Sequence, residues 1–301
     1  MVPHRSVVTI EATPHERRRE VLQFMQLGDA RCERLLEAAE VGVVEMHGLF
    51  HARRGEVIVG AAWGQKTPGR LGFCWPATMA PGEPERTAEL LHAAVDRHLD
   101  LAGILTAQAV VPLRDVVSVM RLVRAGYSHL ADLEYLVSPR LHFPSERPQG
   151  PLTFLSGWRG HEERLKVLIE STYVKTVDCS RLGSPRPLSD VLEGYRETGV
   201  CRPEWWVVAQ HRGEDVGCVL LADHPEHEQC ELMYLGLTPP HRGKGWGSQL
   251  VRYAQFLAYQ RQRAQIVLAV DDANWPARNL YHAAGFEVWD RRSVYVRTVD
   301  S

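Results

Sequence analysis

The two halves of the chain carry the same short patterns at a nearly constant separation, and this repeat constrains the fold more than any other feature. A turn followed by an apolar strand surrounds Gly60 and recurs around Gly217, 157 residues later. A helix end of the form Ala-Gly-aromatic occurs at Gly126 and again at Gly285, 159 residues later. Chance similarity of two short patterns is the alternative, but a fixed offset at both ends of a long window favours a duplicated domain.

A proline-rich segment separates the two halves. Four prolines in so short a span resist both helix and central strand. They are Pro139, Pro144, Pro148 and Pro151. A chain of 301 residues can form one large domain or two of similar size. We therefore expect a first domain over residues 1–137, a linker over 138–151 and a second domain over 152–301.

Hydrophobic periodicity predicts a similar series of elements in each half. Helices come first, an antiparallel meander follows, and strands then alternate with helices. In the second half the expected strands cover residues 205–210, 216–222, 230–237, 265–270 and 288–296, and the later helices cover 245–263 and 275–284. The strands over 133–137 and 293–297 are expected to close their own halves. The predicted fold class is α/β (α+β), a mixed, mostly antiparallel sheet flanked by helices in each half.

Composition excludes several function classes. A net charge of −2 argues against capture of nucleic acid or of an anionic membrane surface. No apolar stretch is long enough to span a bilayer, and no signal-peptide pattern opens the chain, so we expect a cytoplasmic protein. The six cysteines form no CxxC pair and lie beside no zinc-like histidine spacing, so no metal site is expected.

A glycine-rich loop carries the main chemical signal. It runs from Thr238 through two prolines to Ser248, between a strand and an amphipathic helix. Closely spaced glycines let backbone amides converge at a helix N-terminus, where the helix dipole favours an anion. Arg242 and Lys244 add positive charge. Neither the dinucleotide pattern GxGxxG nor the P-loop pattern fits, and we predict a pyrophosphate site.

Two blocks of sequence resemble the GCN5-related N-acetyltransferase (GNAT) superfamily. The first is the spacing Arg242-x-x-Gly245-x-Gly247 after a strand, and the second runs from Ala269 through Asn274 and Tyr281 to Phe286. The resemblance covers about residues 151–301 and implies an acetyl-CoA-dependent acyltransferase whose sheet parts in the middle to admit coenzyme A. The tandem arrangement resembles that of mycothiol synthase in architecture alone.

The resemblance assigns roles to individual residues. The loop amides hold pyrophosphate, strand residues Leu235 to Leu237 pair with pantetheine, and Asn274 contacts the pantetheine side or caps a helix. Tyr281 protonates the leaving thiolate or is a core aromatic residue. The expected cofactor-binding residues are Leu235, Gly236, Leu237, Arg242, Gly243, Lys244, Gly245, Trp246, Gly247, Ser248 and Asn274.

The acceptor side is less defined by sequence. Strand alternation places Glu231 on one face with Met233 and Leu235, and Glu231 is either the catalytic base or a surface carboxylate. Possible acceptor contacts are Tyr173, Asp178, Cys179, Arg181, Trp205 and Trp206. The acceptor itself is expected to be an amine of a small molecule or of a protein.

The first half is expected to have lost cofactor binding. At the 159-residue offset, Asn274 corresponds to Asp115 and Tyr281 to Leu122, and the phosphate loop falls on an acidic segment around residues 81–86. Acidic groups would repel pyrophosphate. The sequence thus predicts acetyl transfer from acetyl-CoA to a primary amine by the second half; a non-catalytic acyl-CoA-binding sensor or interaction module is the alternative.

Overall fold

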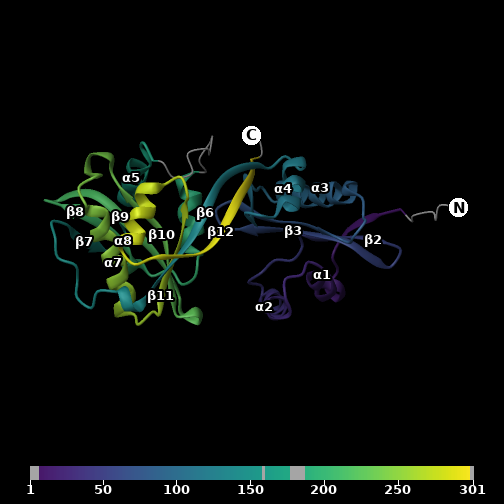
Figure 1. Ribbon diagram of the computed structural model, residues 1–301, viewed down its shortest axis with the longest axis horizontal. Coiled ribbons are helices and arrows are strands. Elements are labelled where there is room, and N and C mark those ends of the chain that lie inside the picture. The colour runs from purple at the N-terminus through teal and green to yellow at the C-terminus, as the bar shows by residue number, and fades with distance from the viewer. Residues whose placement is uncertain (1–6, 158–159, 177–186, 299–301) are drawn as a thin grey trace. The chain divides into compact units, whose positions relative to one another are not determined.

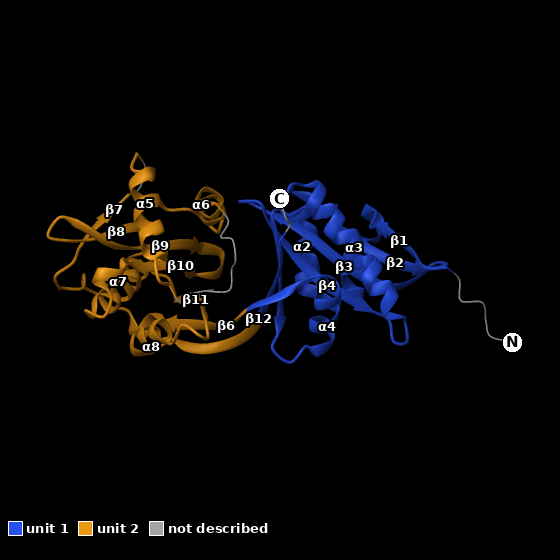
Figure 2. Cartoon of the chain, turned by 90° about the horizontal axis from the view of Figure 1, so that it is seen from above, with its two compact units in different colours: residues 1–130, 293–301 blue, residues 131–292 orange. Residues whose placement is uncertain are grey.

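A computed structural model describes residues 7–157, 160–176 and 187–298, and the chain divides into two compact units. Unit 1 comprises residues 1–130 and 293–301, and unit 2 comprises residues 131–292 (Figure 2). No helix of the described ranges is long and apolar enough to cross a membrane.

Unit 1 contains the first run of strands and helices (Figure 1). Its strands are β1 (Thr9–Ala12), β2 (Leu49–Arg54), β3 (Val57–Thr67), β4 (Leu71–Met79) and β5 (Thr106–Pro112), joined by the last part of β12 (Glu287–Thr298). Its helices are α1 (Arg18–Phe24), α2 (Asp29–Glu40), α3 (Glu85–Leu101) and α4 (Val116–Arg124). The strand order is β1-β2-β3-β4-β5-β12.

Unit 2 repeats this series of elements. Its strands are β7 (Thr153–Ser156), β8 (Trp206–His211), β9 (Glu214–His224), β10 (Gln229–Leu237) and β11 (Gln265–Asp271), with most of β6 (Ser128–Pro139). Its helices are α5 (Glu162–Tyr173), α6 (Leu188–Arg196), α7 (Trp246–Gln260) and α8 (Trp275–Ala283). The strand order is β6-β11-β10-β9-β8-β7.

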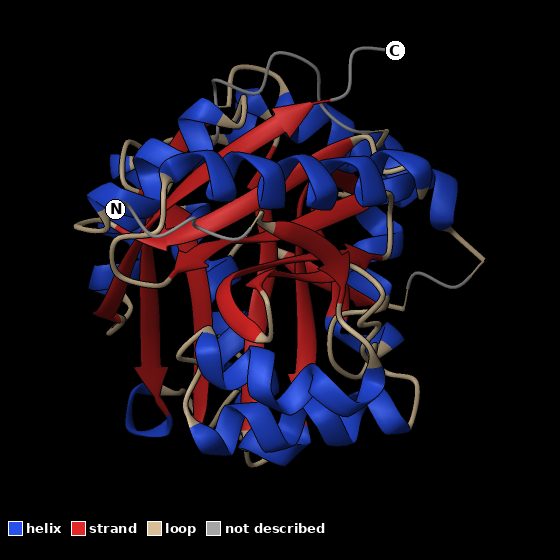
Figure 3. Ribbon diagram, turned by 90° about the vertical axis from the view of Figure 1, so that its right-hand side faces the viewer, coloured by secondary structure: helices blue, strands red, loops and turns tan. Residues whose placement is uncertain are grey.

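The predicted fold class is confirmed in both units. The β4–β5 and β10–β11 pairs are parallel, whereas the β3–β4, β9–β10 and β6–β11 pairs are antiparallel. Helices flank the strands on both sides (Figure 3). The repeat extends to single residues, because Asp115 caps α4 through the amide of Ser118 and Asn274, 159 residues later, caps α8 through the amide of Ala277.

The bounds of the compact units differ from the expected domains at the two closing strands. From Leu133 to Pro139, β6 pairs antiparallel with β11, so the last strand of the first repeat completes the sheet of unit 2. Residues 293–298 of β12 belong to unit 1, where Tyr295 is buried in the core with α3 and α4. Each repeat therefore gives its final strand to the other unit.

The proline-rich segment also differs from expectation, because it lies within unit 2. After Pro139 the chain makes a short helix, residues 140–142, and reaches β7 at Thr153. Phe143 and Leu152 are buried in the core of unit 2, and the Arg147 guanidinium lies over the Tyr253 ring. Burial of these apolar side chains ties a segment that forms no strand to the adjacent sheet.

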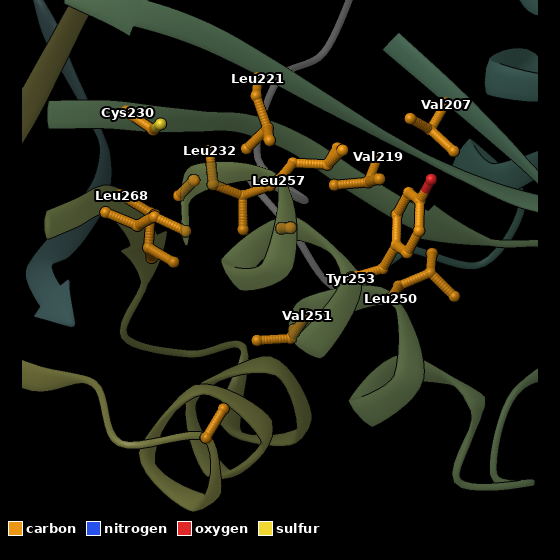
Figure 4. Packing of buried hydrophobic residues seen from close by; sticks show 14 of the residues in the cluster. Val207, Val219, Leu221, Cys230, Leu232, Leu250, Val251, Tyr253, Leu257 and Leu268 are labelled. Carbon is orange, nitrogen blue, oxygen red and sulfur yellow. The ribbon is translucent and has the colours of Figure 1, made fainter. Parts of the chain in front are cut away.

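The main core of unit 2 lies between α7 and one face of its sheet (Figure 4). The α7 residues Leu250, Val251 and Leu257 meet strand residues such as Leu232 and Leu268. The opposite face is covered by α5 and α6 over β8, β9 and β10, in a second cluster. Two layers of helices thus enclose one half of the sheet of unit 2.

The strand exchange predicts which unit responds to a core mutation. Tyr295→Ala removes a buried ring from unit 1 at a cost of about 3–5 kcal/mol. We expect hydrogen exchange to accelerate in β4, α3 and β5, although Tyr295 belongs to the second repeat. The matched variant Leu136→Ala should accelerate exchange in α7, β10 and β11. If each variant instead accelerated hydrogen exchange in the other unit, the assignment of β6 to unit 2 and of the end of β12 to unit 1 would be contradicted.

Candidate functional site

The candidate site begins where β10 parts from β11. These strands pair in parallel only from Gln229 to Glu231, opposite residues 265–267. On its other side β10 stays paired with β9 as far as Leu237. Beyond Glu231, the backbone of β10 therefore faces an opening on the β11 side. Backbone donors and acceptors at such an edge need partners, and an extended ligand can supply them.

A bulge in β10 accompanies this opening and corrects one sequence expectation. The register with β9 shifts between Leu232 and Tyr234, so strict alternation is interrupted. Leu235 packs with the α7 core, whereas Met233 packs with the cluster under α5 and α6. The prediction that Glu231, Met233 and Leu235 share one face was therefore wrong for Leu235.

The glycine-rich loop lies at the end of β10 and leads directly into α7. Gly243 and Gly245 have φ of 73° and 76°, values that a side chain disfavours, and a Cβ at either position would meet nothing within 4 Å. No backbone hydrogen bond from the amides of residues 243–245 occurs within the described part of the chain. Together with the first amides of α7, these groups provide donors for an anion.

The Arg242 side chain braces the glycine-rich loop, that is, it holds the loop in place through hydrogen bonds to the backbone. Its guanidinium donates to the carbonyl oxygens of Leu237 at 3.0 Å, Lys175 at 2.9 Å and Thr172 at 2.7 Å. These bonds join the end of β10 to the end of α5. The Arg242 side chain thus fixes the loop on which the amides lie, and the predicted contact of Arg242 with cofactor stays a prediction.

Lys244 and Trp246 form the outer part of the loop. The Lys244 ammonium lies 5.0 Å from the centre of the Trp246 ring, and the same ring stacks on His241 at 5.3 Å. His241 is itself bonded to Thr238 at 2.7 Å. Lys244 is exposed, so its charge remains available to an anion at the start of α7.

The remaining predicted cofactor residues lie along the same path. Leu235 and Leu237 are half-buried against the α7 core, and Ser248 is exposed in the first turn of α7. A Cβ on Gly236 would lie 2.8 Å from the Thr172 hydroxyl, and one on Gly247 would lie 3.0 Å from Leu280. Gly247 thus permits the close packing of α8 against α7.

Asn274 and Tyr281 both lie on α8. The Asn274 side-chain oxygen accepts from the Ala277 amide at 3.3 Å, so the cap that sequence left as an alternative is present. The Tyr281 ring is 7% exposed and lies 5.5 Å from Phe286 in the core of unit 2. Its packing fixes the ring, and its role in proton transfer stays a prediction.

Glu231 is paired with a histidine that sequence reasoning missed. His224, the last residue of β9, lies 3.1 Å from a Glu231 carboxylate oxygen. The Glu231 side chain is 40% exposed, whereas that of His224 is 16% exposed. The hydrogen bond to Glu231 raises the pKa of His224, although burial opposes it, and Glu226 and Asp223 also favour the charged form. The tight turn between β9 and β10 was the signal that could have located His224.

The residues suggested as acceptor contacts differ in how far their side chains are exposed to a ligand. Trp205 and Trp206 are each 1% exposed and belong to cores, while the Tyr173 ring packs edge-on against Tyr234. Asp178, Cys179 and Arg181 lie outside the described residues. A further cation, Arg252, lines a hollow beside the start of α7 together with Lys244 and Ser248.

The corresponding region of unit 1 is filled by its own side chains. Both backbone groups of Ala77, on the part of β4 beyond its pairing with β5, are bonded: His92 accepts from the amide, and Arg121 donates to the carbonyl. Arg121 also pairs with Glu85 in the first turn of α3, and Glu83 pairs with Arg54. A carboxylate therefore lies at the α3 N-terminus, where it complements the helix dipole.

Arg242 is bonded to three backbone carbonyl oxygens whereas Lys244 is exposed, and this difference leads to a stability prediction. Arg242→Met leaves three carbonyl oxygens without a charged donor and should lower the free energy of unfolding by about 2–3 kcal/mol. Lys244→Met removes an exposed cation and should change it by less than about 0.5 kcal/mol. Urea unfolding of both variants measures the difference, and equal losses would contradict the bracing role.

Comparisons with known proteins agree with this geometry. Residues 171–286 match the model of the acetyltransferase (GNAT) family. A search of curated proteins gives no match. Among solved structures, a GCN5-related N-acetyltransferase from Sphaerobacter thermophilus has 17% identity and a TM-score of 0.67, covering 100% of this chain and 98% of its own.

A second similar structure is a tandem GNAT protein from the clavulanic acid biosynthesis pathway. It has 15% identity and a TM-score of 0.55, and the alignment covers 98% of this chain and 99% of that one. The resemblance to mycothiol synthase stays a prediction. Residues 171–286 therefore match the GNAT acetyltransferase family, and the chain as a whole has the fold of a tandem GNAT protein.

Proposed function

We propose that unit 2 transfers an acetyl group from acetyl-CoA to a primary amine by direct attack in a ternary complex. The observation that carries this proposal is the opening between β10 and β11, which ends at the glycine-rich start of α7. Within the described part of the chain, that side of β10 has no strand partner and can pair with an extended arm, and the loop offers amides to a pyrophosphate. The two features lie in the order that coenzyme A requires.

The residues of the opening suit that ligand in size and charge. Gly243 and Gly245 leave the loop amides uncovered, and Lys244 supplies a nearby cation. The backbone from Leu235 to Leu237 would pair with the pantetheine amides, and Asn274 keeps its side-chain NH₂ group as a donor while its oxygen caps α8. Arg242 contributes by bracing the loop.

Proton transfer would use residues on the two sides of the sheet. Attack needs a neutral amine, so the pair of Glu231 and His224 accepts the ammonium proton. The neutral amine nitrogen then bonds to the acetyl carbon and loses a second proton to solvent, and the carbon–sulfur bond breaks. Tyr281 gives its phenolic proton to the departing thiolate and is reprotonated from solvent.

We also propose that unit 1 binds no coenzyme A. At the 159-residue offset, Glu85 corresponds to Lys244, so the charge at the helix start is reversed. His92 and Arg121, which bond the Ala77 backbone, correspond to the apolar residues Val251 and Leu280 of unit 2. The side chains of unit 1 therefore take the hydrogen bonds that a pantetheine arm would need.

The burial of Tyr281 favours a second candidate function, acyl-CoA binding without catalysis. A Tyr281→Phe variant separates the two, because Phe keeps the packed ring and loses only the hydroxyl. We expect kcat to fall about 10²- to 10⁴-fold, with coenzyme A binding unchanged at one site per chain by titration calorimetry. Unchanged kcat would remove Tyr281 from the mechanism. Two equivalent sites per chain would contradict the proposal for unit 1.

The raised pKa of His224 predicts a pH dependence. Below this pKa the pair of His224 and Glu231 already holds a proton, so kcat/KM should rise as pH increases through it. Glu231→Gln removes the carboxylate that stabilises the imidazolium, so the pKa of His224 falls. The acid limb should then move to lower pH, with a lower maximum rate.

His224→Gln is the matched variant, and the same amine is used throughout so that its own titration is common to all profiles. Because His is the side chain that ordinarily changes charge between about pH 5 and 8, this variant should lose the limb in that range. An acid limb identical in all three proteins would exclude the pair as the base.

A further inference from the structure

One face of the sheet in unit 2 has a strip beside Glu231 that is not packed under α5 and α6. Glu231, Val267 and Val137 are direct neighbours across β10, β11 and β6. One step along the same face, Ala269 pairs with Tyr135. Directly paired residues point to the same side of a sheet, so these five side chains share one face.

This strip is accessible among the described residues. The cluster under α5 and α6 takes residues from β8, β9 and β10, and it includes none from β11 or β6. Accordingly, Ala269 is exposed, and Val267, Val137 and Tyr135 are half-buried. The other face of the same strands, with Ile266, Leu268 and Leu136, is buried against α7 and α8. The strip is therefore a largely apolar surface, with Glu231 at one end and the ion pair of Arg292 and Asp290 near Tyr135 at the other.

Aromatic rings border the strip at its other end. The Trp289 ring is 59% exposed and meets Tyr135 edge-to-face, with 5.8 Å between ring centres. This pair leaves ring surface open for a third aromatic group, which such ring contacts would stabilise beyond simple burial. Burial raises the pKa of Tyr135, so its phenol is neutral at physiological pH.

The position of Ala269 connects the strip to the opening between β10 and β11. The two strands part just beyond Glu231 and Val267, and Ala269 is two residues further along β11. Its small side chain leaves room above the sheet at the edge of that opening. Tyr135 lies two strands from Glu231 and two residues further along the sheet, so the two positions are about 12 Å apart. A molecule with an ammonium group near Glu231 and a ring near Tyr135 would span this distance over Ala269.

We propose that this strip binds the acceptor as a small primary amine that carries a planar aromatic group, with Tyr135 and Trp289 selecting the ring. The inference rests on the proposed acetyl transfer and adds the class of acceptor. Tyr135 comes from β6, the closing strand of the first repeat, so the first repeat supplies a specificity residue to unit 2.

The test compares 2-phenylethylamine with 2-cyclohexylethylamine, which matches it in length and bulk but lacks a π system. Wild type should acetylate the aromatic amine with the higher kcat/KM. Tyr135→Leu and Trp289→Leu should each lower that preference about 3- to 10-fold, mainly through KM for the amine. Tyr135→Phe keeps the ring and should retain the preference. Trp275→Leu is the control, because it removes an exposed ring from α8, on the opposite face of the sheet.

Binding is measured as well as turnover, so that the two proposals fail separately. Quenching of Trp fluorescence by each amine, with coenzyme A present, reports occupancy without chemistry. Equal affinity and equal kcat/KM for both amines would overturn the inference and leave acetyl transfer intact. Ring-selective binding without turnover would overturn the proposed function and keep the strip as a binding site. Preferential acetylation of peptide amines over both small amines would also overturn the inference that the acceptor is a small aromatic amine.

Discussion

The parting of β10 from β11 is the constraint on which the candidate site depends. A β-strand in mid-sheet normally has both edges bonded, and here one edge of β10 loses its partner after three paired residues. The bulge between Leu232 and Tyr234 turns the strand at this point, and Arg242 holds its end against α5. The backbone groups on this edge of β10 can therefore bond a ligand in the interior of the sheet, beside the N-terminus of a helix, which favours anions.

Unit 1 has a corresponding opening, but side chains of unit 1 fill it. Its β4 also leaves β5 after three paired residues, but His92 and Arg121 bond the Ala77 backbone there. Under the proposed function, the shape of the sheet alone does not make a cofactor site. What differs is a small set of side chains, apolar in unit 2 and hydrogen-bonding in unit 1, together with the exchange of Lys244 for Glu85 at the helix start.

Local patterns in the sequence predicted the elements, the glycine-rich loop and the helix cap at Asn274, because each depends on neighbours within a few residues. The exchange of β6 and β12 could not be predicted in this way. Either repeat could close with its own last strand or with the other one, and both strands have similar apolar patterns. The hydrogen bonds of Arg242 could not be predicted either, because the carbonyl oxygens of Thr172 and Lys175 lie at the end of a helix that is distant in sequence. The contact of His224 with Glu231 was not predicted, because it depends on how β9 and β10 pair on either side of the turn that joins them.

The strand exchange gives a physical reason for keeping the first half of the chain, which we propose binds no coenzyme A. A cut within residues 138–151 would leave unit 2 without β6 and its Leu136, and unit 1 without Tyr295 and the rest of β12. Neither sequence half contains a complete unit, so losing the first half would remove a core strand from the unit that carries the candidate site. The same strand brings Tyr135 to the face that bears Glu231. Selection on acetyl transfer would therefore act on the first repeat through β6, even though its own opening is filled.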